Sequence, residues 1–205
     1  MGRAADAGET VDRFAVTPGR ADRAEILAAL PRLATLGVTK LLLRERSASR
    51  EERRKLAEAL LPKCRRAAIA LWISDDVELA ASLPAAGVQL SEAAPSPRVV
   101  RARLPASIAL GVSLHEPISR SADELAVCDH AFLGPVFPTP SKRDARPLGI
   151  AGFLRLAATV SLPVYAIGGI GAAELRQLEQ AGVRRVAAIR LFFGVPVDRA
   201  ARGAS

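Results

Sequence analysis

The chain is poor in cysteine and has no long hydrophobic run. Its 205 residues include two cysteines, Cys64 and Cys128, which are too few for a disulfide scaffold. We expect reduced core thiols in a cytoplasmic protein, although the pair could also form one bridge. The longest apolar run, residues 67–73, is far short of the roughly 20 residues that cross a membrane. The polar segment 1–13 contains no apolar stretch, so we expect no secretory signal there.

Aromatic residues and lysines are also scarce. Only 4% of the residues are aromatic, so the chain offers little surface on which nucleobases could stack. The formal net charge of +8 favours an anionic partner. Most of the basic residues are arginines, however, and this usage in an alanine-rich chain often reflects genomic base composition. We therefore predict neither a nucleic acid nor a membrane as partner, and a homo-oligomer is compatible with the composition.

Short apolar runs recur along the chain and predict its fold. Eight of them do not alternate with polar residues, as is typical of parallel strands buried on both faces. They are residues 13–17, 40–43, 67–73, 88–90, 108–112, 130–133, 164–167 and 186–189. Segments with helical periodicity lie between them, for example 22–34, 50–61, 78–83 and 174–180. One strand and one helix recur about every 25 residues, which indicates successive βα units.

Eight such units indicate an α/β protein, a (β/α)8 TIM barrel that forms a single compact domain. We expect the barrel over 14–195, a disordered leader over 1–13 and a C-terminal tail over 196–205. A doubly wound open sheet is the alternative, because counting strands does not prove closure. Three glycines lie where a helix would meet the next strand, namely Gly37, Gly87 and Gly182. We expect each of them to end a helix in the left-handed conformation.

The residues that follow each strand are the candidates for a functional site, because such barrels bind ligands at the carboxyl ends of their strands. Many of them are polar or cationic, which favours an anionic ligand and most naturally a phosphate ester. We predict phosphate binding after strands six to eight, by Thr139, Ser141, Lys142, Gly168, Gly169 and Arg190. The two glycines follow the seventh strand, where backbone N–H groups and a helix N-terminus commonly bind phosphate.

Two histidines and two aspartates are further candidates. His115 follows the fifth strand at the functional end, where it could transfer protons near neutral pH. His130 opens the sixth strand at the opposite end, so we expect a structural role. Asp75 and Asp76 follow the third strand and could hold Mg²⁺ or cap the next helix. No cluster of Cys and His suggests zinc, and no G-x-S-x-G, Walker or Rossmann motif is present.

Five motifs together resemble a known family. They are LLRER over 42–46, ISD over 73–75, GVSLH over 111–115, GPVFPTPSK over 134–142 and AIGGI over 166–170. In this order they are similar to the thiamine phosphate synthase/TenI family of small TIM barrels. The resemblance implies a role in thiamine (vitamin B1) biosynthesis with one of two activities. A synthase joins hydroxymethylpyrimidine diphosphate to thiazole phosphate with Mg²⁺, whereas a TenI-type thiazole tautomerase needs no metal.

Departures from the synthase pattern favour the tautomerase, which is an isomerase. Leu42 replaces the glutamine that contacts the pyrimidine, Ser74 replaces an asparagine, and Ala94 replaces a second Mg²⁺-binding aspartate. By this resemblance we expect His115 to be the catalytic acid–base residue that aromatises a thiazole carboxylate phosphate, with no cofactor. Glu92 or Asp76 could replace the missing metal ligand if the chain is instead a synthase.

The resemblance also assigns the remaining site residues. Four of them would bind the substrate carboxylate of the tautomerase or the diphosphate of the synthase, namely Arg44, Arg46, Ser74 and Ser113. Asp75 would hold Mg²⁺ only in the synthase, and Arg190 stands where the family usually has a serine near the phosphate. The expected partner in either case is a small phosphorylated thiazole substrate. A further alternative is a diverged barrel that binds a phosphorylated ligand without catalysis.

Overall fold

Strands and helices alternate along the whole described chain. A computed structural model describes residues 11–19, 23–140 and 145–194. The strands are β1 (Asp12–Val16), β2 (Val38–Leu43), β3 (Ala70–Ser74), β4 (Gly87–Leu90), β5 (Ala109–Leu114), β6 (His130–Leu133), β7 (Val164–Ile167) and β8 (Arg185–Ala188). The helices are α1 (Arg23–Thr35), α2 (Arg50–Arg66), α3 (Val77–Ser82), α4 (Pro97–Arg101), α5 (Ala122–Leu125), α6 (Gly149–Ala157), α7 (Ala172–Gln180) and α8 (Arg190–Phe193).

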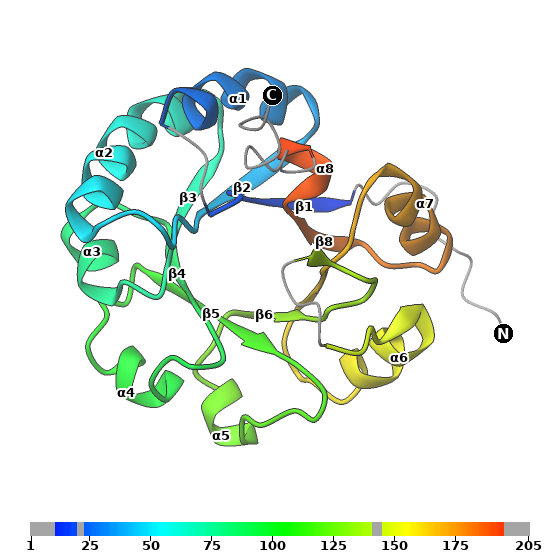
Figure 1. Ribbon diagram of the computed structural model, residues 1–205. Coiled ribbons are helices and arrows are strands. Elements are labelled where there is room, and N and C mark those ends of the chain that lie inside the picture. The colour runs from blue at the N-terminus through cyan, green and yellow to red at the C-terminus, as the bar shows by residue number, and fades with distance from the viewer. Residues whose placement is uncertain (1–10, 20–22, 141–144, 195–205) are drawn as a thin grey trace, which may run out of the picture.

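The strands close into a parallel barrel that the helices surround (Figure 1). Each strand pairs in parallel with the next, and β1 pairs with β8, where Phe14 lies opposite Ala187. This confirms the predicted (β/α)8 TIM barrel and rules out the open doubly wound sheet. Each of the eight apolar runs overlaps one strand of the barrel. The expected tail over 196–205 and residue 195 lie outside the described residues.

Side chains alternate between the two faces of every strand, and each face packs into its own core. On β2, Leu41 and Leu43 pack outward among the helices, whereas Leu42 belongs to a second cluster inside the barrel. Aromatic rings dominate that inner cluster; the centroids of Phe14 and Phe132, for example, lie 5.0 Å apart. These rings fill the centre of the barrel, which leaves its carboxyl end for a ligand site.

The glycine-ended helix predicted at three joints is found at only two of them. Gly37 and Gly182 have φ values of +70° and +82°, as a left-handed helix end requires. Gly87 instead opens β4, and a Cβ atom there would lie 2.4 Å from the Trp72 ring. The prediction at Gly87 was therefore wrong, because this glycine makes room for an indole ring inside the barrel.

A hydrogen-bonded cluster around Asp12 ties three strands together near the amino end of the barrel. Asp12 accepts hydrogen bonds from Thr39, from Lys40 at 2.8 and 3.0 Å, and from the Tyr165 hydroxyl. Burial raises the pKa of Asp12, but these hydrogen bonds outweigh it and hold the pKa below its usual value. Asp12 and Arg13, which were expected to belong to a leader over 1–13, thus lie in β1. Residues 1–10 lie outside the described part.

Both cysteines are free and buried. Burial raises the pKa of Cys64 and of Cys128 to about 11, so neither thiol forms a reactive thiolate near neutral pH. In the part of the chain that the structure describes, no helix is long and apolar enough to cross a membrane.

We predict that Asp12→Asn lowers the free energy of unfolding at pH 7 by about 1–3 kcal/mol, since it weakens a set of charge-assisted hydrogen bonds. The pKa of Asp12 is lower in the folded chain than in the unfolded chain, where it is about 3.9. The carboxylate therefore stabilises the fold fully above that pH, and this contribution is lost as the pH falls through the folded value. Urea denaturation of both proteins between pH 3 and 7 measures the difference.

Asp123→Asn is the matched control, because the Asp123 side chain is 83% exposed on α5. It should change the stability by less than about 0.5 kcal/mol. An Asp12→Asn penalty that stays constant down to pH 3 would contradict the proposed role of the charge.

Candidate active site

Arg44 places a cation at the carboxyl end of β2. Its backbone N–H donates to the buried hydroxyl of Thr17 at 2.8 Å, which fixes the start of the loop to the end of β1. The residue is half-buried. Burial lowers the pKa of Arg44 and the charge of Arg46 lowers it further, whereas Asp75 and Glu45 act in the opposite direction. A half-buried arginine beside a second arginine gains from binding an anion.

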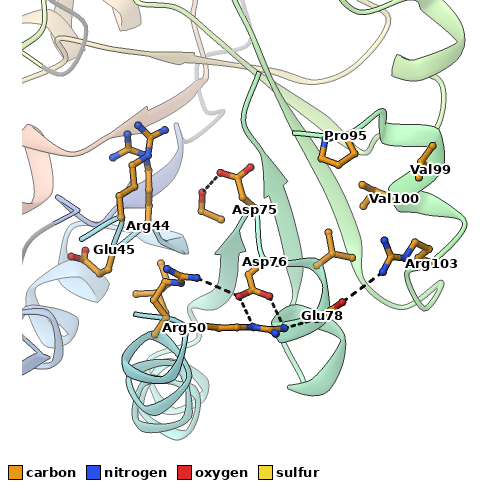
Figure 2. A pocket seen from close by; sticks show the side chains of 15 residues that line it. Arg44, Glu45, Arg50, Asp75, Asp76, Glu78, Pro95, Val99, Val100 and Arg103 are labelled. Carbon is orange, nitrogen blue, oxygen red and sulfur yellow. Dashed lines mark hydrogen bonds and ion pairs between the residues drawn. The ribbon is translucent and has the colours of Figure 1, made fainter. Parts of the chain in front are cut away.

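Asp75 lies at the carboxyl end of β3, next to Arg44 in the pocket of Figure 2. One carboxylate oxygen accepts the Ser91 backbone N–H at 2.6 Å, and the other accepts the Ser74 hydroxyl at 3.3 Å. Asp75 has φ +59°, a left-handed conformation that aspartate tolerates better than most residues. Because a carboxylate offers about four lone-pair positions, Asp75 keeps acceptor capacity for a ligand.

Asp76 lines the same pocket, but both of its carboxylate oxygens have partners within the protein. One of its oxygens caps α3 by accepting the Leu79 N–H at 2.9 Å. The carboxylate also pairs with Arg50 at 3.2 Å and with Arg53 at 3.5 Å (Figure 2). Asp76 is therefore a cap and an ion-pair partner, which leaves Asp75 as the carboxylate beside Arg44.

These groups line a pocket of about 540 Å³ that opens outward from the ends of β2 and β3. Arg44, Arg46, Ser74 and Asp75 belong to its wall, so the structure brings together four of the residues that the sequence predicted. Arg46 is exposed at the rim. Three further arginines of the wall, Arg50, Arg53 and Arg103, pair with Asp76 or Glu78. The other two arginines, together with Asp75, suit an anion with its counter-cation.

The loop after β4 is held by Arg120, a residue that sequence reasoning missed. Its guanidinium is largely buried and donates to the backbone carbonyls of Glu92 and Ala94 at 3.0 and 2.9 Å. Ala94 packs against the hydrophobic core, so this position supplies no ligand atom to the pocket. Neither motif nor spacing links Arg120 to residues 26 and 28 positions earlier.

His115 lies at the end of β5, between this loop and the β6 end. Its Nδ1 hydrogen-bonds the Gly134 carbonyl, and a carbonyl only accepts, so Nδ1 carries the proton. Its Nε2 faces Glu92, whose carboxylate oxygen lies 3.6 Å away. The imidazole is 21% exposed and stays accessible to a ligand. The structure thus places His115 at the functional end, as expected, and in a fixed orientation.

Two loops pack against each other where phosphate binding was predicted. The Val136 and Phe137 N–H groups donate to the carbonyls of Ile167 and Gly168 at 2.9 and 3.1 Å. Gly169 has φ +70°, and a Cβ atom on it would lie 2.6 Å from the Phe137 carbonyl oxygen. Glycine is thus required at this contact between the loops.

The phosphate-binding side chains are only partly described. Thr139 is half-buried on the loop after β6, whereas Ser141 and Lys142 lie outside the described residues. Arg190 follows β8 and donates to the Gly169 carbonyl, with Glu174 3.5 Å from its guanidinium. Arg190 therefore lies at the predicted loop and supports its backbone, while part of its charge is balanced by Glu174.

Comparison with known proteins identifies the family. The family model described as thiamine monophosphate synthase (TMP-TENI) matches residues 14–192. The chain belongs to this family. It is 34% identical over 195 residues to the thiamine-phosphate synthase of Bordetella bronchiseptica, covering 92% of this chain and 90% of that protein. It is 35% identical over 173 residues to the thiamine-phosphate synthase of Geobacillus thermodenitrificans, covering 82% and 78% of the two chains.

A solved structure supports the same assignment. The chain superimposes on the thiamine phosphate pyrophosphorylase of Pyrococcus furiosus with a TM-score of 0.74 and 25% identity, over 92% of this chain and 90% of that one. The predicted family, which is one of thiamine biosynthesis, is thereby confirmed.

The predicted isomerase activity was wrong. The relatives that align with most of the chain are named thiamine-phosphate synthase, which is a transferase and not a tautomerase. The isomerase prediction gave three substitutions, at Leu42, Ser74 and Ala94, more weight than the rest of the chain. Ser74 nevertheless hydrogen-bonds Asp75 and so keeps a polar group beside that carboxylate.

We predict that Gly169→Ala abolishes measurable binding of thiazole phosphate, because its methyl group would push the 134–140 loop away from β7. Isothermal titration calorimetry measures the loss. Gly182→Ala is the matched control: Gly182 also has positive φ, +82°, but a Cβ atom there meets nothing within 4 Å. Gly182→Ala should lose roughly 1–2 kcal/mol of stability to backbone strain. Gly169→Ala should lose more, because its methyl group also collides with backbone atoms. Equal affinity of the two variants for thiazole phosphate would contradict the predicted phosphate site.

Proposed function

We propose that the protein is a thiamine-phosphate synthase, a transferase that joins hydroxymethylpyrimidine diphosphate to thiazole phosphate. One observation carries the proposal, namely 34–35% identity over 92% of the chain to proteins named for that activity. The family model, which matches residues 14–192, spans every strand end that contributes to the site. The pocket at the ends of β2 and β3 offers room for one anionic substrate, and the paired loops after β6 and β7 lie where phosphate binding is predicted for the other.

The reaction transfers the exocyclic CH2 group of the pyrimidine from an oxygen of the diphosphate to the ring nitrogen of the thiazole. The thiazole ring nitrogen donates its lone pair to the exocyclic CH2 of the pyrimidine, and the C–O bond to the diphosphate breaks. Diphosphate leaves with the electron pair, so negative charge grows on the oxygen that had linked the CH2 carbon to phosphorus. Groups that bind this charge more tightly in the transition state than in the ground state accelerate the reaction. We assign that role to Arg44 and Arg46, with hydrogen bonds from Ser74 and Ser113.

The residues at β3 fit a magnesium ion that is shared with the diphosphate. Mg²⁺ is usually held by one or two carboxylates together with substrate phosphates and water. Asp75 supplies one carboxylate with free acceptor positions, and Glu92 lies on the neighbouring loop. Among the described residues, no group of three or more acidic, histidine or cysteine side chains could hold the ion without substrate. When bound, the ion would neutralise charge on the leaving diphosphate.

The second substrate is assigned to the other half of the barrel mouth. Gly168 and Gly169 would present backbone groups to the thiazole phosphate, with Thr139 on the loop after β6 and Arg190 beside Gly169. Ser141 and Lys142, which lie outside the described residues, are assigned to the same phosphate on the basis of the sequence alone. His115 lies between the two halves. The thiazole nitrogen attacks with its own lone pair, so the condensation requires no general base. We therefore assign His115 Nε2 a hydrogen-bonding role toward a substrate.

The test is the formation of thiamine phosphate from pyrimidine diphosphate, thiazole phosphate and Mg²⁺ by the purified protein. We expect turnover that EDTA abolishes and Mg²⁺ restores. We expect Asp75→Asn to lower kcat/KM by at least about 100-fold, because an amide keeps the hydrogen bond from Ser91 but loses the charge that holds the ion.

Asp123→Asn on α5 is the control and should retain full activity. If the wild-type protein binds thiazole phosphate but forms no thiamine phosphate, the synthase proposal is wrong. The diverged phosphate-binding barrel is then the better description, and the apolar Leu42 and Ala94 are the residues that favour it.

A further inference from the structure

Three polar side chains form a continuous hydrogen-bonded chain across the inside of the barrel. His130 Nε2 lies 2.8 Å from Gln89 Oε1, and Gln89 Nε2 lies 3.2 Å from Ser113 Oγ. The three residues come from β6, β4 and β5, which are neighbours in the sheet. This row of hydrogen bonds begins in the aromatic interior at His130 and ends at Ser113, which is half-buried near the carboxyl end of β5.

Its inner end is buried and surrounded by rings. Gln89 is 2% exposed and His130 is 5% exposed. The His130 ring packs against Trp72, Phe132 and other aromatic rings, with centroid distances of 4.8 and 5.3 Å to these two. Burial, reinforced by the charge of Lys40, lowers the pKa of His130 to about 4, so the imidazole is neutral at pH 7.

This environment gives the chain a direction. An amide oxygen only accepts hydrogen bonds, so His130 Nε2 carries the ring proton and donates to Gln89 Oε1. The Gln89 NH2 group must then face Ser113, and it donates to the hydroxyl oxygen. A hydroxyl that accepts this bond keeps one proton to donate elsewhere. Of the three hydrogen-bonded residues only Ser113 is not buried, and it lies one residue before the carboxyl end of β5.

A glycine makes this arrangement sterically feasible. A Cβ atom on Gly111 would lie 2.1 Å from Gln89 Oε1 and 2.6 Å from His130 Nε2. Any other residue at this position would displace both groups. The chain therefore rests on four residues from three strands.

We propose that Gln89 is a positioning residue that aims the Ser113 hydroxyl proton at an oxygen of the bound diphosphate. The identity of this ligand rests on the synthase proposal, whereas the direction of the hydrogen bonds rests on the barrel interior alone. Gln89 does not touch substrate and acts only through Ser113. Substitution of either residue should thus weaken the same hydrogen bond from the Ser113 hydroxyl to the diphosphate. Substitution of both should weaken diphosphate binding no more than substitution of Ser113 alone.

A double-mutant cycle tests this coupling by calorimetric binding of inorganic diphosphate, with and without Mg²⁺. Ser113→Ala should weaken binding by about tenfold, as expected for a lost hydrogen bond to a charged group. Gln89→Met should weaken it by a similar factor in the wild-type background and by less than about twofold in the Ser113→Ala background. Equal effects of Gln89→Met in both backgrounds, or no effect, would refute the proposal.

Two further variants separate positioning from stability. Gln89→Met leaves the buried His130 donor without an acceptor, whereas Gln89→Met/His130→Phe removes both polar groups and should recover thermal stability. Diphosphate binding should stay weak in that stable double variant; wild-type binding there would refute the proposal. Trp72→Phe controls for loosening of the interior, since the indole N–H has no hydrogen-bond partner, and it should bind diphosphate like the wild type.

The binding assay also keeps the two proposals apart. Diphosphate binding that depends on Ser113 and Gln89 in the predicted way, without formation of thiamine phosphate, would overturn the synthase and keep the positioning role. Formation of thiamine phosphate together with additive effects of the two variants on diphosphate binding would support the synthase and overturn the positioning role.

Discussion

Closure of the parallel barrel is the constraint from which the site follows. With β1 paired to β8, the side chains on one face of every strand must share a single interior. Large rings such as Phe14 and Trp72 fill the centre, and the Asp12 cluster satisfies the polar groups near the amino end. Only the carboxyl end is then left for groups that bind a ligand, and the residues there come from loops far apart in the chain.

The same constraint explains why the fold could be predicted from the sequence. A strand that is buried on both faces must be apolar at nearly every position, so runs such as residues 40–43 and 164–167 mark strands directly. Gly87 shows the limit of this reasoning. It stands at the same spacing as Gly37 and Gly182, but its role depends on a tryptophan of the neighbouring strand. Local spacing does not encode that contact.

The sequence predicted the placement of residues that lie at their own strand ends, but not of residues whose side chains contact partners on another strand or loop. Arg44, Asp75 and His115 lie at strand ends, where their position and the family resemblance predicted them; their roles stay predictions. Arg120 and Gln89 act on partners at least 24 residues away, and their functional atoms meet only in the folded barrel. The choice between isomerase and transferase failed for a related reason, because single positions were weighed without the contacts that compensate them.

Charge balance shows how the proposed synthase could tolerate the loss of a metal-binding carboxylate at Ala94. With fewer carboxylates, the metal ion is held less tightly by the protein. Cationic side chains around the diphosphate can offset this, because they neutralise part of the charge that the ion would otherwise neutralise. Arg44 is half-buried beside Arg46, and the pKa of Arg44 is lowered by burial and by that second charge. Binding a diphosphate there relieves the repulsion between the two arginines as well as neutralising the ligand. In this arrangement Asp75 need only position the ion, while the two arginines neutralise much of the negative charge that develops on the leaving diphosphate.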